Sequence, residues 1–387
     1  MLAVIFAYLI FFRDDARGDA EMQKTATSPA TALRAGTIPP TTFSPAQTPA
    51  KSEPDLVWCG YGAIKRVDDQ VPPQLRGATH SALQYTVRQL QDSAEERERA
   101  LGGYAAVLYA DIEAMQVYRD THPECAEADN CAQQTDRTSN AATLAALGPL
   151  VRLAGDSRDP ASYAAAFHAC TAHDPQKLTQ ACLSITATRW AQLDPGNAAP
   201  WIFVADDALQ RADYATRDDA LFQISKAGSV NLRLPYLPAI LTSAAGSAQA
   251  PELQVGMALD LYGAYAAQAT PAYASALAPC LRGELRDSNQ RQLCSDIADK
   301  LSRYDENLTG RFFALQMGKR AGWPQAQLTA LQAEIKTLHQ SLYALDQSGE
   351  TYSCTWLAAQ QKNIKGLAQF GELAWAKRQL AAKAQAK

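Results

Sequence analysis

The sequence predicts an all-α protein that is built from antiparallel helical hairpins and cross-linked by disulfide bonds. Three observations carry this prediction. Alanine, leucine and glutamine dominate the chain, and alternating runs of valine or isoleucine are scarce, which is typical of helices. Apolar residues recur three and four positions apart in most segments. Six of the eight cysteines form three pairs that are close in the sequence.

The length and charge limit the classes of protein that the chain can belong to. Its 387 residues can form one large domain or two ordinary ones, with an ample core. The formal net charge of −4 gives no sign of a nucleic-acid-binding protein, which would carry a strongly basic surface.

The amino-terminal segment, residues 1–18, is predicted to be a membrane anchor or an export signal. Residues 1–12 are an unbroken apolar run, which as a helix would span about 18 Å, short of the ~30 Å hydrocarbon core of a bilayer. No basic residue precedes the run and no clear cleavage site follows it before Arg13. It is therefore the end of an anchor that starts upstream or an atypical export signal; a buried core helix fits the flanking linker less well.

Residues 19–55 are predicted to be a disordered linker. This stretch is rich in Thr, Ser, Pro and Ala, and it has too little apolar surface to offset the entropy lost on ordering. The helical body then covers residues 56–387. A subdivision near 229–250 is possible, because Pro235 and Pro238 interrupt the helical pattern there.

Two cysteines lie on neighbouring predicted helices in the centre of the body. A helix over 162–171 carries Cys170, Pro175 interrupts the pattern, and a second helix over 176–193 carries Cys182. A proline disfavours helical backbone angles in the residue before it, and it fits well in the first turn of the helix that follows. Two antiparallel helices joined so tightly can bring residues about 12 apart to disulfide distance.

The stretch from Leu193 to Ala227 resembles a tetratricopeptide repeat. The residues that carry the resemblance are Leu193-Asp194-Pro195, Trp201, Val204-Ala205, Ala208, Asp213-Tyr214, Ala220 and Ala227. The resemblance implies a helical hairpin with Trp201 packed between its helices, and an α-solenoid with a concave surface if such hairpins stack. Three extra residues, 215–217, depart from the family's turn. The alternative is an antiparallel helix pair with no family tie, in an irregular bundle.

The remaining helices follow from apolar spacing and helix breakers. They are expected at 78–90, 93–120, 141–154, 198–211, 271–281, 287–304, 324–345 and 354–386, with further helical pattern from 252. The helix over 324–345 has a heptad-like seam, Leu328 to Leu345, which favours packing within the chain over dimerisation. The last helix ends in basic residues, which suit its dipole; contact with phospholipid or an acidic partner is a second interpretation.

The cysteines predict an oxidising compartment. The expected bridges are Cys125–Cys131, Cys170–Cys182, Cys280–Cys294 and Cys59–Cys354, because the local pairings are the least strained. The alternative is zinc, for which His168, Cys170, His173 and Cys182 are four potential ligands. Their spacing lacks the tight Cys-x-x-Cys of zinc sites, so we expect neither a metal nor a cofactor.

The function predicted from these features is binding rather than catalysis. The sequence carries none of the common catalytic or phosphate-binding motifs. The predicted partner-binding residues are Asp206, Asp207 and Gln210, on the exposed inner face of the repeat-like hairpin. We expect a periplasmic protein, anchored to the inner membrane by its amino terminus, that binds protein or peptide partners and no nucleic acid. The alternative is a helical hydrolase or metal-dependent enzyme with its site near His168 and His173.

Overall fold

The structure is a computed structural model, and it describes residues 56–59, 62–64, 73–122, 132–171, 182–233, 273–282, 285, 287–344 and 353–385. The chain divides into two compact units, Met1–Gln70 and Val71–Lys387. The predicted anchor and linker, residues 1–55, lie outside the described residues, as does the helical pattern expected from 252 to 265. None of the helices in the described part of the chain is long and apolar enough to cross a membrane.

The described part of the first unit is a short β-ribbon. Strand β1 (Leu56–Trp58) pairs antiparallel with strand β2 (Gly62–Ile64), with Leu56 opposite Ile64 and Trp58 opposite Gly62. Gly62 has a φ of 77°, a left-handed conformation that glycine adopts without strain. This ribbon is a small departure from the all-helical body predicted from residue 56.

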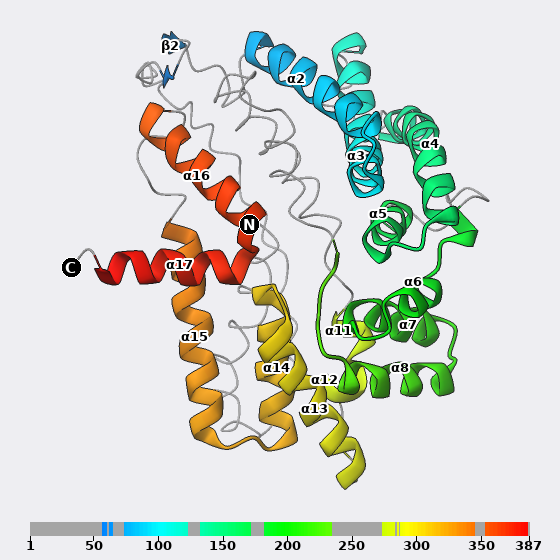
Figure 1. Ribbon diagram of the computed structural model, residues 1–387, viewed down its shortest axis with the longest axis vertical. Coiled ribbons are helices and arrows are strands. Elements are labelled where there is room, and N and C mark those ends of the chain that lie inside the picture. The colour runs from blue at the N-terminus through cyan, green and yellow to red at the C-terminus, as the bar shows by residue number, and fades with distance from the viewer. Residues whose placement is uncertain are drawn as a thin grey trace, which may run out of the picture. The chain divides into compact units, whose positions relative to one another are not determined.

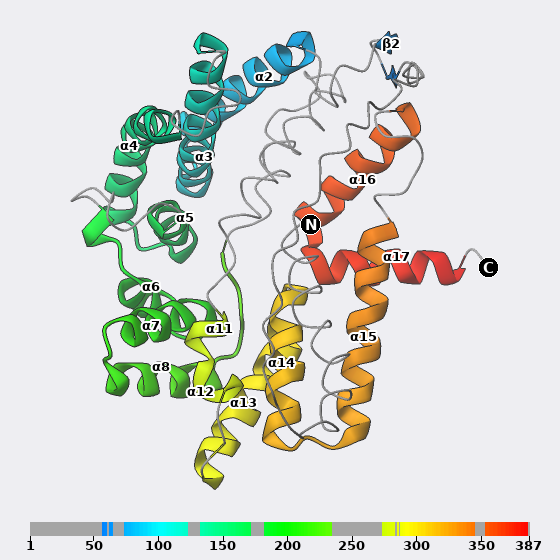
Figure 2. The same cartoon turned by 180° about the vertical axis from the view of Figure 1, so that it is seen from behind.

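The named secondary-structure elements in the described part of the second unit are all helices (Figures 1 and 2). The helices up to residue 226 are α2 (Pro73–Gln91), α3 (Glu96–Thr121), α4 (Ala132–Asp156), α5 (Pro160–Thr171), the 3-10 helix η4 (Cys182–Ser184), α6 (Ala187–Leu193), α7 (Ala198–Gln210) and α8 (Tyr214–Lys226). Those that follow are α11 (Tyr273–Ala276), α12 (Ala278–Leu281), α13 (Ser288–Tyr304), α14 (Leu308–Ala321), α15 (Gln325–Ala344), α16 (Cys354–Phe370) and α17 (Glu372–Gln385).

Most helices pack on their neighbours in sequence. Helix α2 packs on α3, α3 on α4 and α5, α5 on α6, α6 on α7, and α7 on α8. The series continues from α8 to α13, then to α14, α15 and α17, which also packs on α16. Because each helix buries its apolar face against the next, the prediction of stacked helix pairs is confirmed, and the arrangement is compatible with a helical repeat.

The core between these helices combines small and aromatic side chains. Alanines such as Ala164, Ala198 and Ala205 are fully buried, and their small side chains let neighbouring helices approach closely. Trp190 is also fully buried, and its ring lies within 5.4 Å of the Phe167 ring and 6.0 Å of the Phe203 ring, centroid to centroid. The predicted seam of α15 is buried from Leu328 to Leu338, as expected for packing within the chain.

Two of the predicted disulfide bonds are present in the second unit. Cys170 bonds to Cys182 and Cys280 bonds to Cys294. Cys59 and Cys354 are also disulfide-bonded, and their predicted pairing with each other stays a prediction. Cys125 and Cys131 lie outside the described residues.

Several helix boundaries differ from the prediction. Helix α4 begins at Ala132, nine residues before the predicted start at 141, and the stretch predicted as one helix over 271–281 contains α11 and α12. The stretch predicted as one helix over 176–193 contains η4 and α6, with non-helical residues 185–186 between them, because Thr186 caps α6 by accepting a hydrogen bond from the Arg189 amide. The three residues 215–217 do not extend the turn of the repeat-like hairpin but form the first turn of α8. The predicted last helix is two helices, because Gly371, with a φ of 76°, ends α16.

Candidate functional site

The predicted partner-binding residues lie on α7, and one of them is already used within the fold. The Asp206 carboxylate accepts hydrogen bonds from the Ser275 hydroxyl on α11 and from the Gln210 amide. Asp207 and Gln210 are exposed, and Asp207 pairs with Arg211 one turn further along the helix. Asp206 thus joins two packed helices, and the exposed part of the predicted face is Asp207 and Gln210.

Trp201, which the resemblance places between the helices of the hairpin, is only half-buried. Its indole Nε1 donates to the Pro195 carbonyl at 3.4 Å. The fully buried indole in this region is that of Trp190, on α6. Trp201 packs against the core, but as a partly buried side chain at its edge rather than within it, and its place between the two helices of the hairpin stays a prediction.

His168, the centre of the alternative enzymatic site, is a buried core residue. Its imidazole is surrounded edge-on by the rings of Phe167, Trp190 and Phe203, at centroid distances of 5.6, 5.3 and 5.5 Å. Burial lowers its pKa to about 4, while Nε2 donates to the Leu232 carbonyl at 3.2 Å. A neutral imidazole enclosed in this way fixes the backbone rather than meeting a substrate.

The zinc alternative loses two of its four potential ligands. Cys170 and Cys182 are bonded to each other, so neither is a thiolate that could bind a metal. His173 lies outside the described residues. Within the part of the chain that the structure describes, no group of three or more His, Cys, Asp or Glu side chains is placed to hold a metal ion.

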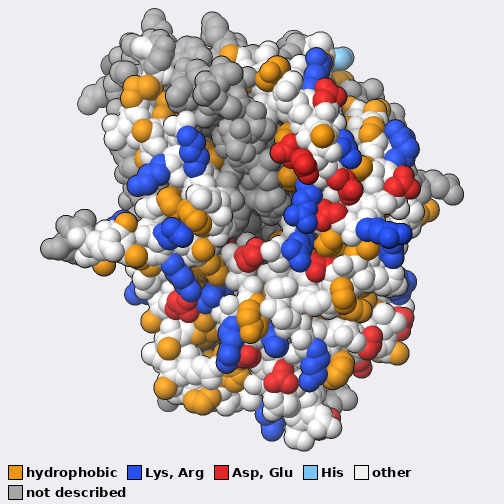
Figure 3. All heavy atoms as spheres, viewed as in Figure 1, with side chains coloured by type: hydrophobic (Ala, Val, Ile, Leu, Met, Phe, Trp, Pro, Cys, Tyr) orange, Lys and Arg blue, Asp and Glu red, His pale blue; other side chains and the backbone are white. Residues whose placement is uncertain are grey.

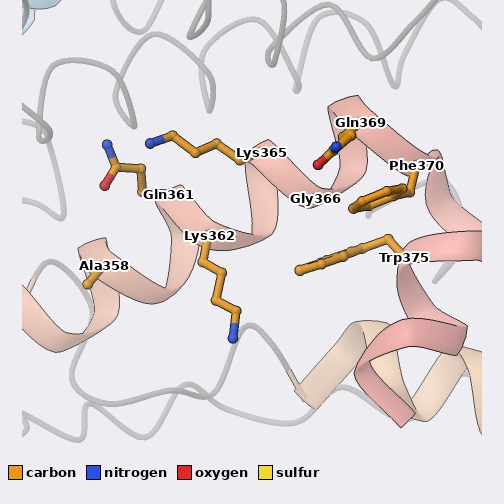
Figure 4. Close-up of a pocket in the computed structure, with 8 residues that line it drawn as sticks. All are labelled: Ala358, Gln361, Lys362, Lys365, Gly366, Gln369, Phe370 and Trp375. Carbon is orange, nitrogen blue, oxygen red and sulfur yellow. The ribbon is translucent and has the colours of Figure 1, made fainter. Parts of the chain in front are cut away.

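A candidate binding site lies between α16 and α17, in an open pocket of about 330 Å³ (Figure 4). Gly371 ends α16 with a positive φ, and Glu372 begins α17 with a negative charge at its amino end, where the helix dipole favours it. The break turns the chain so that α17 packs on α16. Residues from both helices can therefore surround one space.

The floor of the pocket is aromatic. The Trp375 indole extends beneath α16 and is only 7% exposed. Its close approach needs Gly366, because a Cβ at that position would lie 2.3 Å from the indole. The indole Nε1 donates to the Asn363 side-chain oxygen at 2.7 Å, so the ring is held both by packing and by a hydrogen bond.

A second aromatic ring lies beside the first. The Phe370 ring is nearly parallel to the Trp375 indole, with an angle of 11° and a centroid separation of 6.2 Å. The Arg378 guanidinium lies 3.8 Å from the centroid of the Phe370 ring, close enough for a cation–π contact. The floor is therefore a fixed aromatic surface.

The rim of the pocket is polar and positively charged. It is formed by α16 residues, which Figure 4 shows as sticks: Ala358, Gln361, Lys362, Lys365 and Gln369. Lys362 and Lys365 are exposed, and neither forms an ion pair with any residue that the structure describes. Among the described side chains that line the pocket there is no carboxylate, imidazole, thiol or hydroxyl, and its ionisable groups are the two lysine amines. Such a lining suits the binding of an acidic group.

The sequence pattern does not predict the pocket, although signals of it are visible there. A single helix over 354–386 would place Gly366 and Trp375 more than two turns apart, where they cannot touch. Gly371, followed directly by Glu372, was the available sign of a helix end and a new start. A scan of family models, a search of curated proteins and a search of solved structures found no match for this chain.

Proposed function

We propose that this protein is a non-enzymatic binding protein, held on the periplasmic side of the inner membrane by its amino terminus, whose helical body binds protein or peptide partners. The observation that carries the proposal is the pocket between α16 and α17, which joins a fixed aromatic floor to an uncompensated positive rim. Buried aromatic side chains are the residues on which binding energy concentrates in protein interfaces.

The disulfide bonds support the choice of compartment. Cys170–Cys182 and Cys280–Cys294 each link residues of neighbouring elements, and such bonds persist in oxidising spaces such as the periplasm. The apolar run in residues 1–18 supplies the proposed anchor, and residues 19–55 the tether.

The stacked helix pairs support a binding role for the body as a whole. The hairpin of α7 and α8, with its tetratricopeptide-like sequence, belongs to a class of structure that presents extended surfaces to peptides. In this proposal Asp207 and Gln210, the exposed residues of the α7 face, form a second contact region.

The test is site-specific photo-crosslinking in living cells of the source organism. The full-length chain carries p-benzoylphenylalanine at Gln369, on the pocket rim, or at Gln210, on α7. A matched control carries it at Lys319, an exposed residue of α14. We expect a discrete protein adduct from one or both of the first two positions and none from the control. Equal incorporation with no adduct from either position would overturn the proposal.

The compartment is tested separately by thiol labelling. Cells are denatured in the presence of maleimide, without reductant, and the labelled cysteines are mapped by mass spectrometry. We expect Cys170, Cys182, Cys280 and Cys294 to be protected. Labelling of these four in the cellular protein would place it in a reducing space and contradict a periplasmic location.

A further inference from the structure

The basic charge of the α16–α17 region identifies the kind of partner that it fits. The two helices carry Lys362, Lys365, Lys377, Arg378 and Lys383, against the single acidic residue Glu372, whereas the whole chain has a net charge of −4. In Figure 3, Lys and Arg side chains gather over α16 and α17 with few acidic neighbours, while both signs mix over α3 to α6. A local excess of positive charge on an acidic protein attracts an acidic ligand.

Two of these cations lie at the pocket and are available for a ligand. Lys377 pairs with Glu334 of α15 at 3.1 Å, and Arg378 lies over the Phe370 ring. Lys362 and Lys365, by contrast, are exposed at the rim of the pocket and unpaired within the described part of the chain. They are three residues apart on one helix, so their side chains start from neighbouring positions, and in Figure 4 their ammonium groups point to different sides of α16, Lys362 on the side of Trp375.

The aromatic floor requires an apolar group from the same ligand. Figure 4 shows the indole of Trp375 extending toward the stem of Lys362, with Phe370 beside it. A ligand that only neutralised the lysines would leave this floor unused. Gln369 adds an amide donor and acceptor at the rim, the groups that pair with a peptide backbone.

A membrane surface fits the same region less well. Helices that bind the bilayer interface project large apolar side chains from their exposed face. The large apolar side chains that are exposed in the described part of the chain lie elsewhere, on α2, α3, η4, α8 and α13. Trp375, at 7% exposure, is recessed and can be reached only by a side chain that enters the pocket.

We propose that the pocket binds an acidic segment of a partner protein, with one aromatic or large aliphatic side chain of that segment on the Trp375 floor and its flanking carboxylates on Lys362 and Lys365. This assignment rests on the proposed binding function and names the chemistry of the partner. The aromatic floor supplies most of the binding energy, and the lysines supply selection for acidic sequences and a faster association rate.

The experiment selects ligands without assuming their identity. A random peptide library displayed on phage is panned against the full chain and, in parallel, against a Lys362→Glu/Lys365→Glu variant. The matched control is Lys319→Glu/Lys336→Glu, which changes the net charge equally at exposed residues outside the pocket and outside α16 and α17. We expect the wild type and the control to enrich acidic peptides that contain one aromatic or large aliphatic residue. The pocket variant should lose that enrichment.

The best enriched peptide is then titrated by fluorescence anisotropy. Reversal of both lysines should weaken its binding about tenfold or more, because two weak attractions become repulsions. The control variant should bind within about twofold of the wild type, since exposed charges outside the pocket are largely screened. Raising the salt from about 0.1 M to about 1 M should also weaken binding, because the screening length falls from about 10 Å to about 3 Å. Thermal unfolding followed by circular dichroism verifies that each variant is folded.

The possible failures are distinguishable. Enrichment of basic or neutral peptides, or of acidic peptides that bind the pocket variant equally well, would overturn the pocket assignment. Absence of any enrichment would also overturn it. The binding function itself would still stand if photo-crosslinking at Gln210 captured a protein, and it would fail if neither Gln210 nor Gln369 captured one.

Discussion

The buried carboxyl group of Asp305 should make the stability of this protein fall as the pH rises through neutrality. Asp305 follows α13 and is only 2% exposed. The Tyr273 hydroxyl donates to Oδ2 at 2.7 Å and the Asn307 amide donates to Oδ1 at 2.9 Å. Burial raises the pKa of Asp305 to about 7, and these two hydrogen bonds only partly oppose the effect, while the charge of Glu306 adds to it.

The sign and size of the effect follow from that pKa. The ordinary value for aspartate is 3.8, so the folded protein holds the Asp305 proton more tightly than the unfolded chain. The resulting stabilisation is complete below about pH 4 and is lost as the pH rises through about 7. Because the two pKa values lie about three pH units apart, the contribution to the free energy of unfolding is about 4 kcal/mol at most.

The Asp305→Asn substitution isolates this contribution. An amide keeps the shape of the side chain and an acceptor for the Tyr273 hydroxyl, and it does not titrate. We expect the difference in unfolding free energy between the variant and the wild type to increase in favour of the variant between pH 4 and pH 8. Urea unfolding, followed by circular dichroism at several pH values, gives both free energies. Parallel pH profiles for the two proteins would refute the reasoning.

Three further predictions concern packing and covalent links. Trp190→Ala should lower the free energy of unfolding by about 3–5 kcal/mol, the usual range for a fully buried aromatic, and clearly more than Trp201→Ala. Loss of one bridge through Cys170→Ser with Cys182→Ser should cost about 3 kcal/mol in the chain-entropy description, measured by urea unfolding without reductant. Gly366→Ala should displace the indole on the pocket floor, which lies 2.3 Å from the added methyl group, and so shift tryptophan fluorescence and lower the melting temperature.

Each of these predictions has a matched comparison. Trp190→Phe should cost less than Trp190→Ala, because the indole Nε1 has no hydrogen-bond partner among the described residues. Gly155→Ala, in α4, adds a methyl group with nothing within 4 Å, and it should not lower the melting temperature. Equal losses from Trp190→Ala and Trp201→Ala, or from the two glycine substitutions, would contradict the packing described for these residues. An unchanged unfolding curve for the Cys170→Ser/Cys182→Ser variant would contradict the stabilising role of this disulfide bond.

The sequence predicted those features whose causes are local. Cys170 and Cys182 are separated by one interruption of the helical pattern, and Cys280 and Cys294 by another, so their bonds could be anticipated from spacing alone. Leu328 to Leu338 repeat at helical intervals, and the buried face of α15 follows directly.

Features that join distant segments could not be predicted in the same way. Asp305, Glu306 and Asn307 have the composition of an exposed turn, yet Asp305 is enclosed by Tyr273 from α11 and by Gly310, where a Cβ would meet its carboxylate. His168 looked like a possible catalytic or metal-binding residue because histidine is common at such sites. Its burial depends on Trp190 and Phe203, which lie on two other helices.

The segment after α8 shows most clearly why local patterns were insufficient. The Leu232 carbonyl accepts from His168 on α5, and the Asn231 carbonyl and amide bond to the side chain of Asn197 before α7. Val230 forms a parallel bridge with Asp305 after α13.

These bonds tie three separate parts of the chain to a strand-like stretch that has no helical period, so no analysis of periodicity can detect them. Two buried titratable groups lie at this segment. His168 donates to it in the neutral form and Asp305 lies beside it in the protonated form, so both groups, which solvent cannot reach, are uncharged between about pH 4 and about pH 7. The stabilising contribution of His168 is lost as the pH falls from about 6.5 toward 4, whereas that of Asp305 is lost as the pH rises toward 7. The two groups therefore change the stability of this segment in opposite directions as the pH changes. The stability of this segment therefore depends on both groups, and the Asp305→Asn variant removes only the pH-dependent contribution of Asp305.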